Sequence, residues 1–189
     1  MKIRPKYNSP VILTYSLICA IVYLIGWLTS GNSTTQFFML FFTSFSDPLL
    51  YVRVFTYVFG HYNWAHFIAN ITMLLLIGPL VEEKYGQNSL IRMIFITTIV
   101  GAIVHLITSD AGALGASGII YMIVLLSSFS NSKKGEIPLT FVLVCIIFLG
   151  GDIVAAFTID DNVSRLGHLV GGILGAILGF LHLGRGKGR

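Results

Sequence analysis

Residues 11–28 read VILTYSLICAIVYLIGWL, an apolar run of about 18 residues without a charged side chain. A helix of that length crosses the hydrocarbon core of a bilayer, whereas a cleaved signal peptide has a shorter apolar segment and a small-residue cleavage site. Ser16, Cys19 and Gly26 do not form such a site. We therefore expect residues 11–28 to stay in the protein as a membrane-spanning helix.

The rest of the chain has the same apolar character. Hydrophobic residues make up 55% of the 189 residues and charged residues 11%, with a mean hydropathy of +0.85. A soluble domain carries roughly a quarter charged residues, so this chain cannot cover a water-exposed surface. The same values exclude a disordered chain. The net charge of +4 comes from small clusters, so no nucleic-acid partner is expected. An integral membrane protein in a lipid bilayer remains.

Six apolar runs are separated by polar or glycine-rich segments. Their approximate bounds are 11–28, 64–81, 90–108, 117–130, 138–157 and 166–183, and an aromatic-rich segment occupies residues 29–63. Backbone in lipid must form helices or closed barrels, and barrel strands would be about 10 residues long with strict alternation. The sequence therefore predicts an all-α polytopic membrane protein with six transmembrane helices in one domain, residues 1–189.

The basic residues are distributed unevenly between the two ends of these helices. In the six-helix arrangement, ten of the 12 lie on one side: Lys2, Arg4, Lys6, Lys84, Arg92, Lys133, Lys134, Arg185, Lys187 and Arg189. Only Arg53 and Arg165 lie on the other. The positive-inside rule then predicts that both termini are cytoplasmic. We expect a multi-pass protein of a bacterial cytoplasmic membrane, with residues 29–63 outside, in the membrane interface.

Four polar side chains are expected at similar depth near the outer face. The even-numbered predicted helices run from outside to inside, so their first residues lie at that face. His66 and Asn70 are near the start of the second helix, Ser117 starts the fourth, and His168 is near the start of the sixth. Because polar groups inside a membrane are costly, they are candidates for function.

Ser117 and His168 form a candidate nucleophile and base. Ser117 lies in Gly115-Ala-Ser-Gly118, where a loop turns into a helix whose free N–H groups suit a developing oxyanion. A serine needs an adjacent base, which a neutral imidazole supplies. The alternatives are an ordinary N-cap for Ser117 and a capping or packing role for His168. Small residues recur every four positions around the histidine, at Gly167, Gly171, Gly175 and Gly179. Such a stripe permits close helix contact, here with the fourth helix.

Further side chains suit supporting roles. His66 and Asn70 are four residues apart on one helix face, and both can donate hydrogen bonds to an oxyanion together with the Ser117 amide. No metal site is expected, because His61 and His66 do not share a helix face; His61 is expected to satisfy loop backbone. Tyr121 follows Ser117 by one turn and either stacks on the imidazole or is an ordinary core aromatic.

Two acidic residues lie within or directly after an apolar run. Asp152 either orients His168 as the acid of a triad, faces a water-filled cavity, or pairs with a loop donor. Glu82 is expected to tie down the inner end of the second helix, with Lys84 or Arg92 as a partner.

These motifs together resemble the rhomboid intramembrane serine proteases. The resemblance rests on His66-Phe-Ile-Ala-Asn70, on Gly115-Ala-Ser-Gly118, and on Gly167-His168 followed by Gly171 and Gly175, in this order and at one membrane face. It implies the minimal six-span bacterial form, a serine endopeptidase without a cofactor whose partners are transmembrane-protein substrates. It also implies a Ser117–His168 dyad without an acid, an oxyanion hole of His66, Asn70 and the Ser117 amide, and Tyr121 stacked on His168. Gly115 and Gly118 would support this site.

Arg53 resembles the arginine of the family's Trp-Arg pair in the first outer loop. Val52 stands in place of the tryptophan, so the packing of this loop anchor is expected to differ. A catalytically inactive relative that binds transmembrane helices for quality control is the alternative function. It would lack the serine or the histidine, and both are present here. A small transporter would instead group its polar residues at the bilayer midplane. No particular oligomeric state is predicted.

Overall fold

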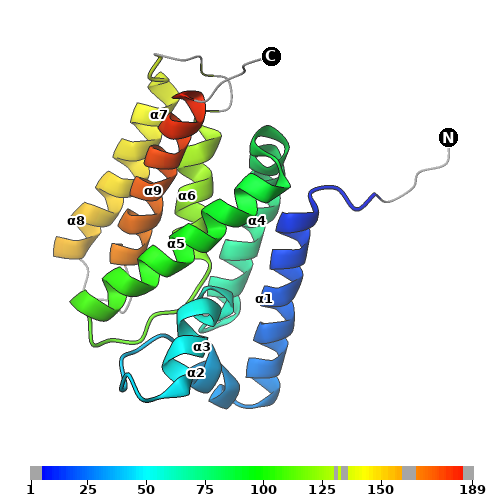
Figure 1. The fold of residues 1–189 in the computed structure, drawn as a ribbon, viewed down its shortest axis with the longest axis vertical. Helices are drawn as coiled ribbons and strands as arrows, with labels where there is room; N and C mark the ends of the chain where they lie inside the picture. Colours follow the sequence, from blue (N-terminus) through cyan, green and yellow to red (C-terminus); the bar gives the residue numbers. More distant parts are fainter. Residues whose placement is uncertain (1–5, 130–131, 133–135, 159–164, 185–189) are drawn as a thin grey trace.

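The computed structural model describes residues 6–129, 132, 136–158 and 165–184, and this part of the chain is an all-α bundle. The long helices are α1 (Pro10–Leu28), α4 (Trp64–Tyr85), α5 (Gln87–Thr108) and α9 (Arg165–Gly184) (Figure 1). Between α1 and α4 lie α2 (Asn32–Phe37), α3 (Pro48–Thr56) and the 3-10 turn η1 (Tyr57–Phe59). The later part contains α6 (Ser117–Ser127), α7 (Leu139–Val144), the π-helical η2 (Cys145–Gly150) and α8 (Gly151–Thr158). The basic residues at positions 2, 4, 133, 134, 185, 187 and 189 lie outside the described residues.

Several helices have the length and the surface of membrane spans. Within the described ranges, four are long and apolar enough to cross a bilayer: Pro10–Leu28, Trp64–Tyr85, Gln87–Thr108 and Arg165–His182. Ser117–Ser127 and Leu139–Ala155 are apolar but shorter, and they occupy the predicted fourth and fifth runs. Large apolar side chains face outward, with Ile107 78% exposed and Leu76 67% exposed. Because water does not favour such surfaces, lipid must cover them, and the chain is a multi-pass integral membrane protein.

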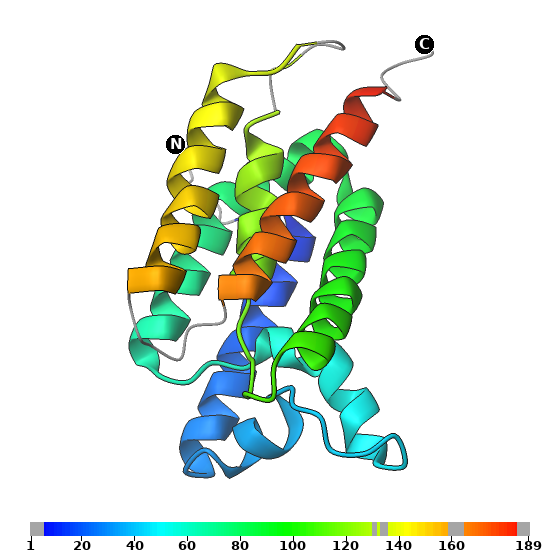
Figure 2. The ribbon, with the colours of Figure 1, turned by 90° about the vertical axis from the view of Figure 1, so that its left-hand side faces the viewer.

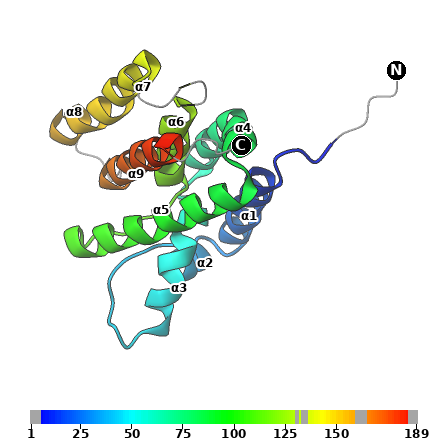
Figure 3. The same cartoon turned by 45° about the horizontal axis from the view of Figure 1, so that its top comes forward.

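The short helix α6 lies at the centre of the bundle (Figure 3). Its residues Ile119, Ile120 and 122–126 are all buried. A helix that is apolar on every side is stable when it is enclosed, and α4, α5 and α9 surround α6. The α7–η2–α8 segment lies at the outside of the bundle, next to α9 (Figures 2 and 3). Neighbouring helices therefore hold α6, which begins at Ser117.

Glycines allow α9 to approach α6 closely. Gly171 lies against the backbone carbonyl of Gly118, and a Cβ added to Gly175 would lie 2.5 Å from the Met122 carbonyl oxygen. A Cβ added to Gly118 would lie 3.1 Å from the Gly167 oxygen. Because these contacts advance in the same direction along both chains, the two helices run parallel and begin toward the end of the bundle that carries α2 and α3 (Figure 2).

A buried carboxylate joins α4 to the start of α1. The two oxygens of Glu82 accept hydrogen bonds from the backbone N–H groups of Val11 at 3.1 Å and Ile12 at 3.0 Å. Pro10, the first residue of α1, has no N–H, so these bonds satisfy the next two free donors of the helix. A negative charge also suits the positive end of a helix. The contacts shown for Glu82 are thus to backbone of α1, whereas the sequence suggests the side chain of Lys84 or Arg92.

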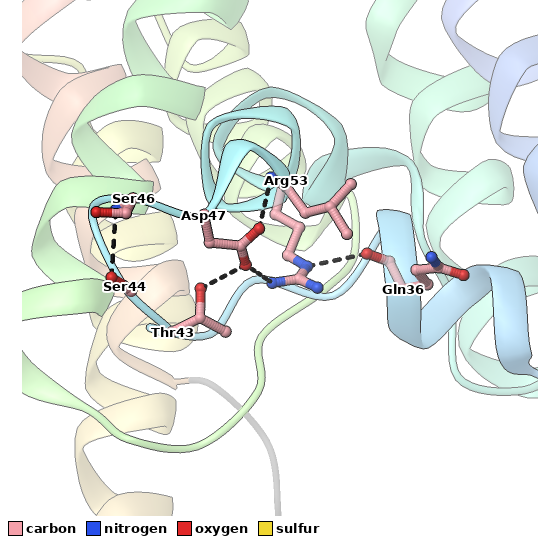
Figure 4. A network of polar contacts seen from close by, with 7 residues as sticks. Gln36, Thr43, Ser44, Ser46, Asp47 and Arg53 are labelled. Carbon is pink, nitrogen blue, oxygen red and sulfur yellow. Dashed lines mark hydrogen bonds and ion pairs between the residues drawn. The ribbon is translucent and has the colours of Figure 1, made fainter.

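Arg53 anchors the segment between α1 and α4 (Figure 4). Its Nε donates to the Gln36 carbonyl oxygen at 2.9 Å, and its Nη1 lies 3.5 Å from Asp47 Oδ2. The guanidinium carbon lies 4.2 Å from the centre of the Phe41 ring. Val52 is 41% exposed. The aromatic contact of Arg53 thus comes from Phe41, a residue distant from the position where the resemblance expects tryptophan.

Candidate active site

The loop before α6 presents Ser117 at the first position of the helix. The Gly115 N–H donates to the Tyr57 carbonyl at 2.9 Å, and Ala113 and Leu40 exchange two backbone hydrogen bonds at 2.8 and 2.9 Å. These bonds fasten the loop to the segment between α1 and α4. The N–H of Ser117 belongs to the first turn of α6, so it has no carbonyl partner in its own helix. It is available at the positive end of the helix dipole.

His66 and Asn70 lie next to the loop that carries Ser117. Asn63 begins α4 by accepting the His66 N–H at 2.8 Å. A Cβ added to Gly115 would lie 2.8 Å from His66 Cε1, 2.9 Å from His66 Nε2 and 3.9 Å from Asn70 Nδ2. Gly115 also has a φ of 124°, which other residues rarely adopt. Glycine at this position therefore permits the close approach of both side chains.

The Asn70 amide is a buried donor without a partner. Its side chain is only 6% exposed, and Nδ2 makes no hydrogen bond within the described part of the chain. An unpaired buried donor costs about 1–3 kcal/mol. Because Nδ2 is unpaired and lies beside the candidate nucleophile, it is free to donate to an acceptor on a bound ligand, such as an oxyanion.

His168 is held on the same side of α6 as Ser117. Its ring stacks on Tyr121, with centroids 4.4 Å apart and planes at 14°. Tyr121 follows Ser117 by four residues, so both side chains lie on one face of α6. Phe148 packs edge-on against Tyr121 at 5.5 Å.

Asp152 is the partner of His168. Its Oδ2 accepts a hydrogen bond from His168 Nδ1 at 2.9 Å. Of the three interpretations that the sequence left open for Asp152, the structure therefore shows the contact with His168. The preceding turn, η2, is π-helical and therefore wider than an α-helical turn. Such a turn changes the face on which the following residues lie. An acid in an apolar run indicates a function, but because of the π-helical turn the sequence alone could not choose among the three interpretations.

A small cavity of about 40 Å³ lies beside Ser117. Tyr57, Thr97 and His105 are among its lining residues. The volume is sufficient for a water molecule, and Thr97 Oγ1 is buried without a hydrogen bond in the described part of the chain. His105 Nε2 donates to the Ala111 carbonyl at 2.8 Å and so fixes the loop that leads to α6. No group of three potential metal ligands occurs among the described residues.

His61 packs against His66 and bonds the backbone that precedes α4. Its Nδ1 donates to the Phe59 carbonyl at 3.1 Å, and its ring packs edge-on against His66 with centroids 5.1 Å apart. Burial and, to a lesser extent, the neighbouring His66 lower the pKa of His61 to about 4. His61 is therefore neutral at physiological pH and places no charge next to His66.

Comparison with known proteins identifies the family. The model of the Rhomboid domain matches residues 49–185. The chain is also 26% identical over 164 residues to RHOMBOID-like protein 12, mitochondrial, of Arabidopsis thaliana. That match covers 74% of this chain and 48% of the plant protein, so the chain spans about half the length of the curated relative it matches. Because the family model covers every helix that holds the site, from α4 to α9, this chain belongs to the rhomboid family.

Proposed function

We propose that this chain is an intramembrane serine endopeptidase that hydrolyses transmembrane segments of membrane proteins. The observation that carries the proposal is the stack of His168 on Tyr121, one helical turn from Ser117. It holds an imidazole on the same helix face as a hydroxyl at the start of that helix. Membership of the rhomboid family supports the same reaction class.

The reaction begins with a proton transfer. His168 takes the proton from Ser117 Oγ while the oxygen attacks the carbonyl carbon of the substrate peptide bond. The electron pair of the carbonyl moves to its oxygen, which accepts hydrogen bonds from the Ser117 N–H, Asn70 Nδ2 and His66. The imidazolium then gives its proton to the departing amine, and an ester on Ser117 remains. Water, deprotonated by the same imidazole, hydrolyses the ester and restores the serine.

Charge distribution supports an orientation with the site at the outer membrane face. Ten of the 12 basic residues belong to the opposite side in the six-helix arrangement, so we place both termini in the cytoplasm of a bacterial cell. A substrate helix must unwind there, which is easiest at small or helix-breaking residues. In a cysteine-free variant, a membrane-impermeant thiol reagent should label Ser33→Cys in intact cells and should not label Lys84→Cys. The reverse pattern would contradict this orientation.

Cleavage of a single-span reporter in proteoliposomes tests the activity. We expect Ser117→Ala and His168→Ala each to lower cleavage by at least about 10³-fold. Ser128→Ala is the matched control, because this serine lies at the other end of α6 and its hydroxyl hydrogen-bonds only the Val124 carbonyl in the described structure. A fluorophosphonate probe should label Ser117 in the unmodified protein.

Three outcomes would count against the proposal. Undiminished cleavage by Ser117→Ala, or probe labelling at another serine alone, would reject Ser117 as the nucleophile. Reporter binding without cleavage by the unmodified protein would instead identify an inactive rhomboid-like protein that binds transmembrane helices.

A further inference from the structure

Asp152 and His168 meet where α8 packs against α9. Asp152 Oδ2 lies 2.9 Å from His168 Nδ1, and each side chain is only 14% exposed. An ionised carboxylate accepts hydrogen bonds and does not donate them, so this contact requires a proton on Nδ1. In a neutral imidazole, Nε2 then carries no proton and is the nitrogen that can accept one.

Tyr121 holds the same imidazole from a second direction. Its ring covers one face of the His168 ring, with the planes at 14°. The stack on Tyr121 and the hydrogen bond to Asp152 together fix the orientation of the imidazole, so its two nitrogens cannot exchange places. Tyr121 stands on α6, so this arrangement is fixed relative to Ser117.

We propose that Asp152 is a positioning residue that completes a Ser117–His168–Asp152 triad. This inference rests on the proposed proteolytic function, and it departs from the acid-free dyad that the family resemblance implies. Asp152 keeps His168 in the tautomer that accepts the Ser117 proton. Its negative charge stabilises the imidazolium that forms when the proton moves, while Asp152 itself stays ionised throughout.

Alternatively, the bond between Asp152 and His168 could serve only to hold α8 against α9, and this role predicts different effects of mutation. Removal of such a tie would lower the free energy of unfolding, or would loosen substrate binding and raise KM. Removal of a positioning residue lowers kcat, because the chemical step loses its correctly oriented base. Separate measurement of kcat, KM and unfolding thus distinguishes the two roles.

The test compares Asp152→Asn with the unmodified protein in the reporter assay. An asparagine amide can donate to Nδ1, which places the proton on Nε2 and removes the base. The equivalent exchange in a soluble serine protease lowers kcat by about 10⁴-fold. We expect a fall of at least about 10²-fold here, with KM changed by less than about two-fold, and partial recovery in Asp152→Glu. Asp110→Asn is the matched control, because it makes the same exchange at an exposed loop residue and should keep full activity.

Two results would overturn the proposal. A kcat for Asp152→Asn within about two-fold of the unmodified protein, with Ser117→Ala inactive, would leave a protease that works as a dyad. If the unmodified protein shows no Ser117-dependent cleavage, the proposed function fails, and nitrogen NMR of His168 then tests Asp152 independently. A positioned imidazole shows the Nδ1-protonated tautomer in the unmodified protein and loses it in Asp152→Asn. The same tautomer in both proteins would exclude a positioning role.

Discussion

Gly171 of α9 lies directly against the backbone carbonyl of Gly118 in α6, with no room for a side-chain atom between them. Gly118 follows Ser117 in the chain, and Gly171 lies three residues after His168. This backbone contact therefore sets how closely the helix of the candidate nucleophile approaches the helix of the candidate base. The contact depends on glycine, since any Cβ at position 171 forces the helices apart.

We expect Gly171→Ala to separate α6 from α9. The free energy of unfolding, measured by denaturant titration in micelles, should fall by about 1–3 kcal/mol. A displacement of about 1 Å at the site should also lower reporter cleavage by about 10²-fold. Gly150→Ala is the control, because a Cβ there meets no atom of the described chain within 4 Å. Activity and stability like the unmodified protein in Gly171→Ala would show that this contact does not set the helix spacing.

Asn70→Ala should separate activity from stability. The variant loses a proposed oxyanion donor, so kcat should fall by about 10²–10³-fold while KM changes little. The free energy of unfolding should not fall, because the amide nitrogen that is removed, Nδ2, has no hydrogen-bond partner in the described structure. Asn70→Asp keeps the size of the side chain but cannot donate, so it should be equally inactive. A parallel loss of stability and activity in Asn70→Ala would point to a packing role instead.

Glu82→Gln should weaken the connection between α1 and α4. Only one oxygen remains to accept the N–H groups of Val11 and Ile12, and the new amide N–H₂ faces a donor. The free energy of unfolding should fall by about 1–3 kcal/mol. The exposed neighbour offers the matched exchange Glu83→Gln, which should have no such effect. Equal stability of the two variants would argue against a capping role for Glu82.

Arg53→Lys should loosen the segment between α1 and α4. Lysine keeps the charge, but it cannot bond the Gln36 carbonyl and Asp47 while it stacks on Phe41. Amide hydrogen exchange should become faster across residues 36–47. Arg92→Lys, at an exposed site on α5, should leave exchange in this segment unchanged. Unaltered exchange in Arg53→Lys would show that other contacts hold the segment.

His61 should make the protein less stable in mild acid. Burial places its folded-state pKa at about 4 against an ordinary value of 6.5, so between these values the unfolded chain binds the extra proton. The free energy of unfolding is therefore unaffected by His61 above about pH 6.5, and it decreases as the pH falls from there toward 4. The free energy of unfolding should decrease by about 2 kcal/mol between pH 7 and pH 4.5. In His61→Gln, which does not titrate, that part of the decrease should disappear; an identical pH dependence would assign it to other groups.

Prediction from sequence was most successful where length and polarity decide the structure. The run 11–28 corresponds to α1 at Pro10–Leu28, and the run 166–183 to α9 at Arg165–Gly184. In lipid the backbone must bond to itself, so an apolar run of this length becomes a helix whatever its neighbours are. The π-helical turn η2 could not be predicted, because its residues are as apolar and as compatible with helix as those on either side.

By itself, the sequence determined an all-α membrane protein of the rhomboid kind with polar residues near one end of its helices, because hydropathy, length and local motifs are properties of short segments. Only the tertiary structure decided which side chains meet. The bond from Glu82 to the start of α1 spans 70 positions, and the bond from Asp152 to His168 spans 16 across a wide turn. Such pairs depend on how helices pack and rotate against one another, and no local pattern of residues contains that information.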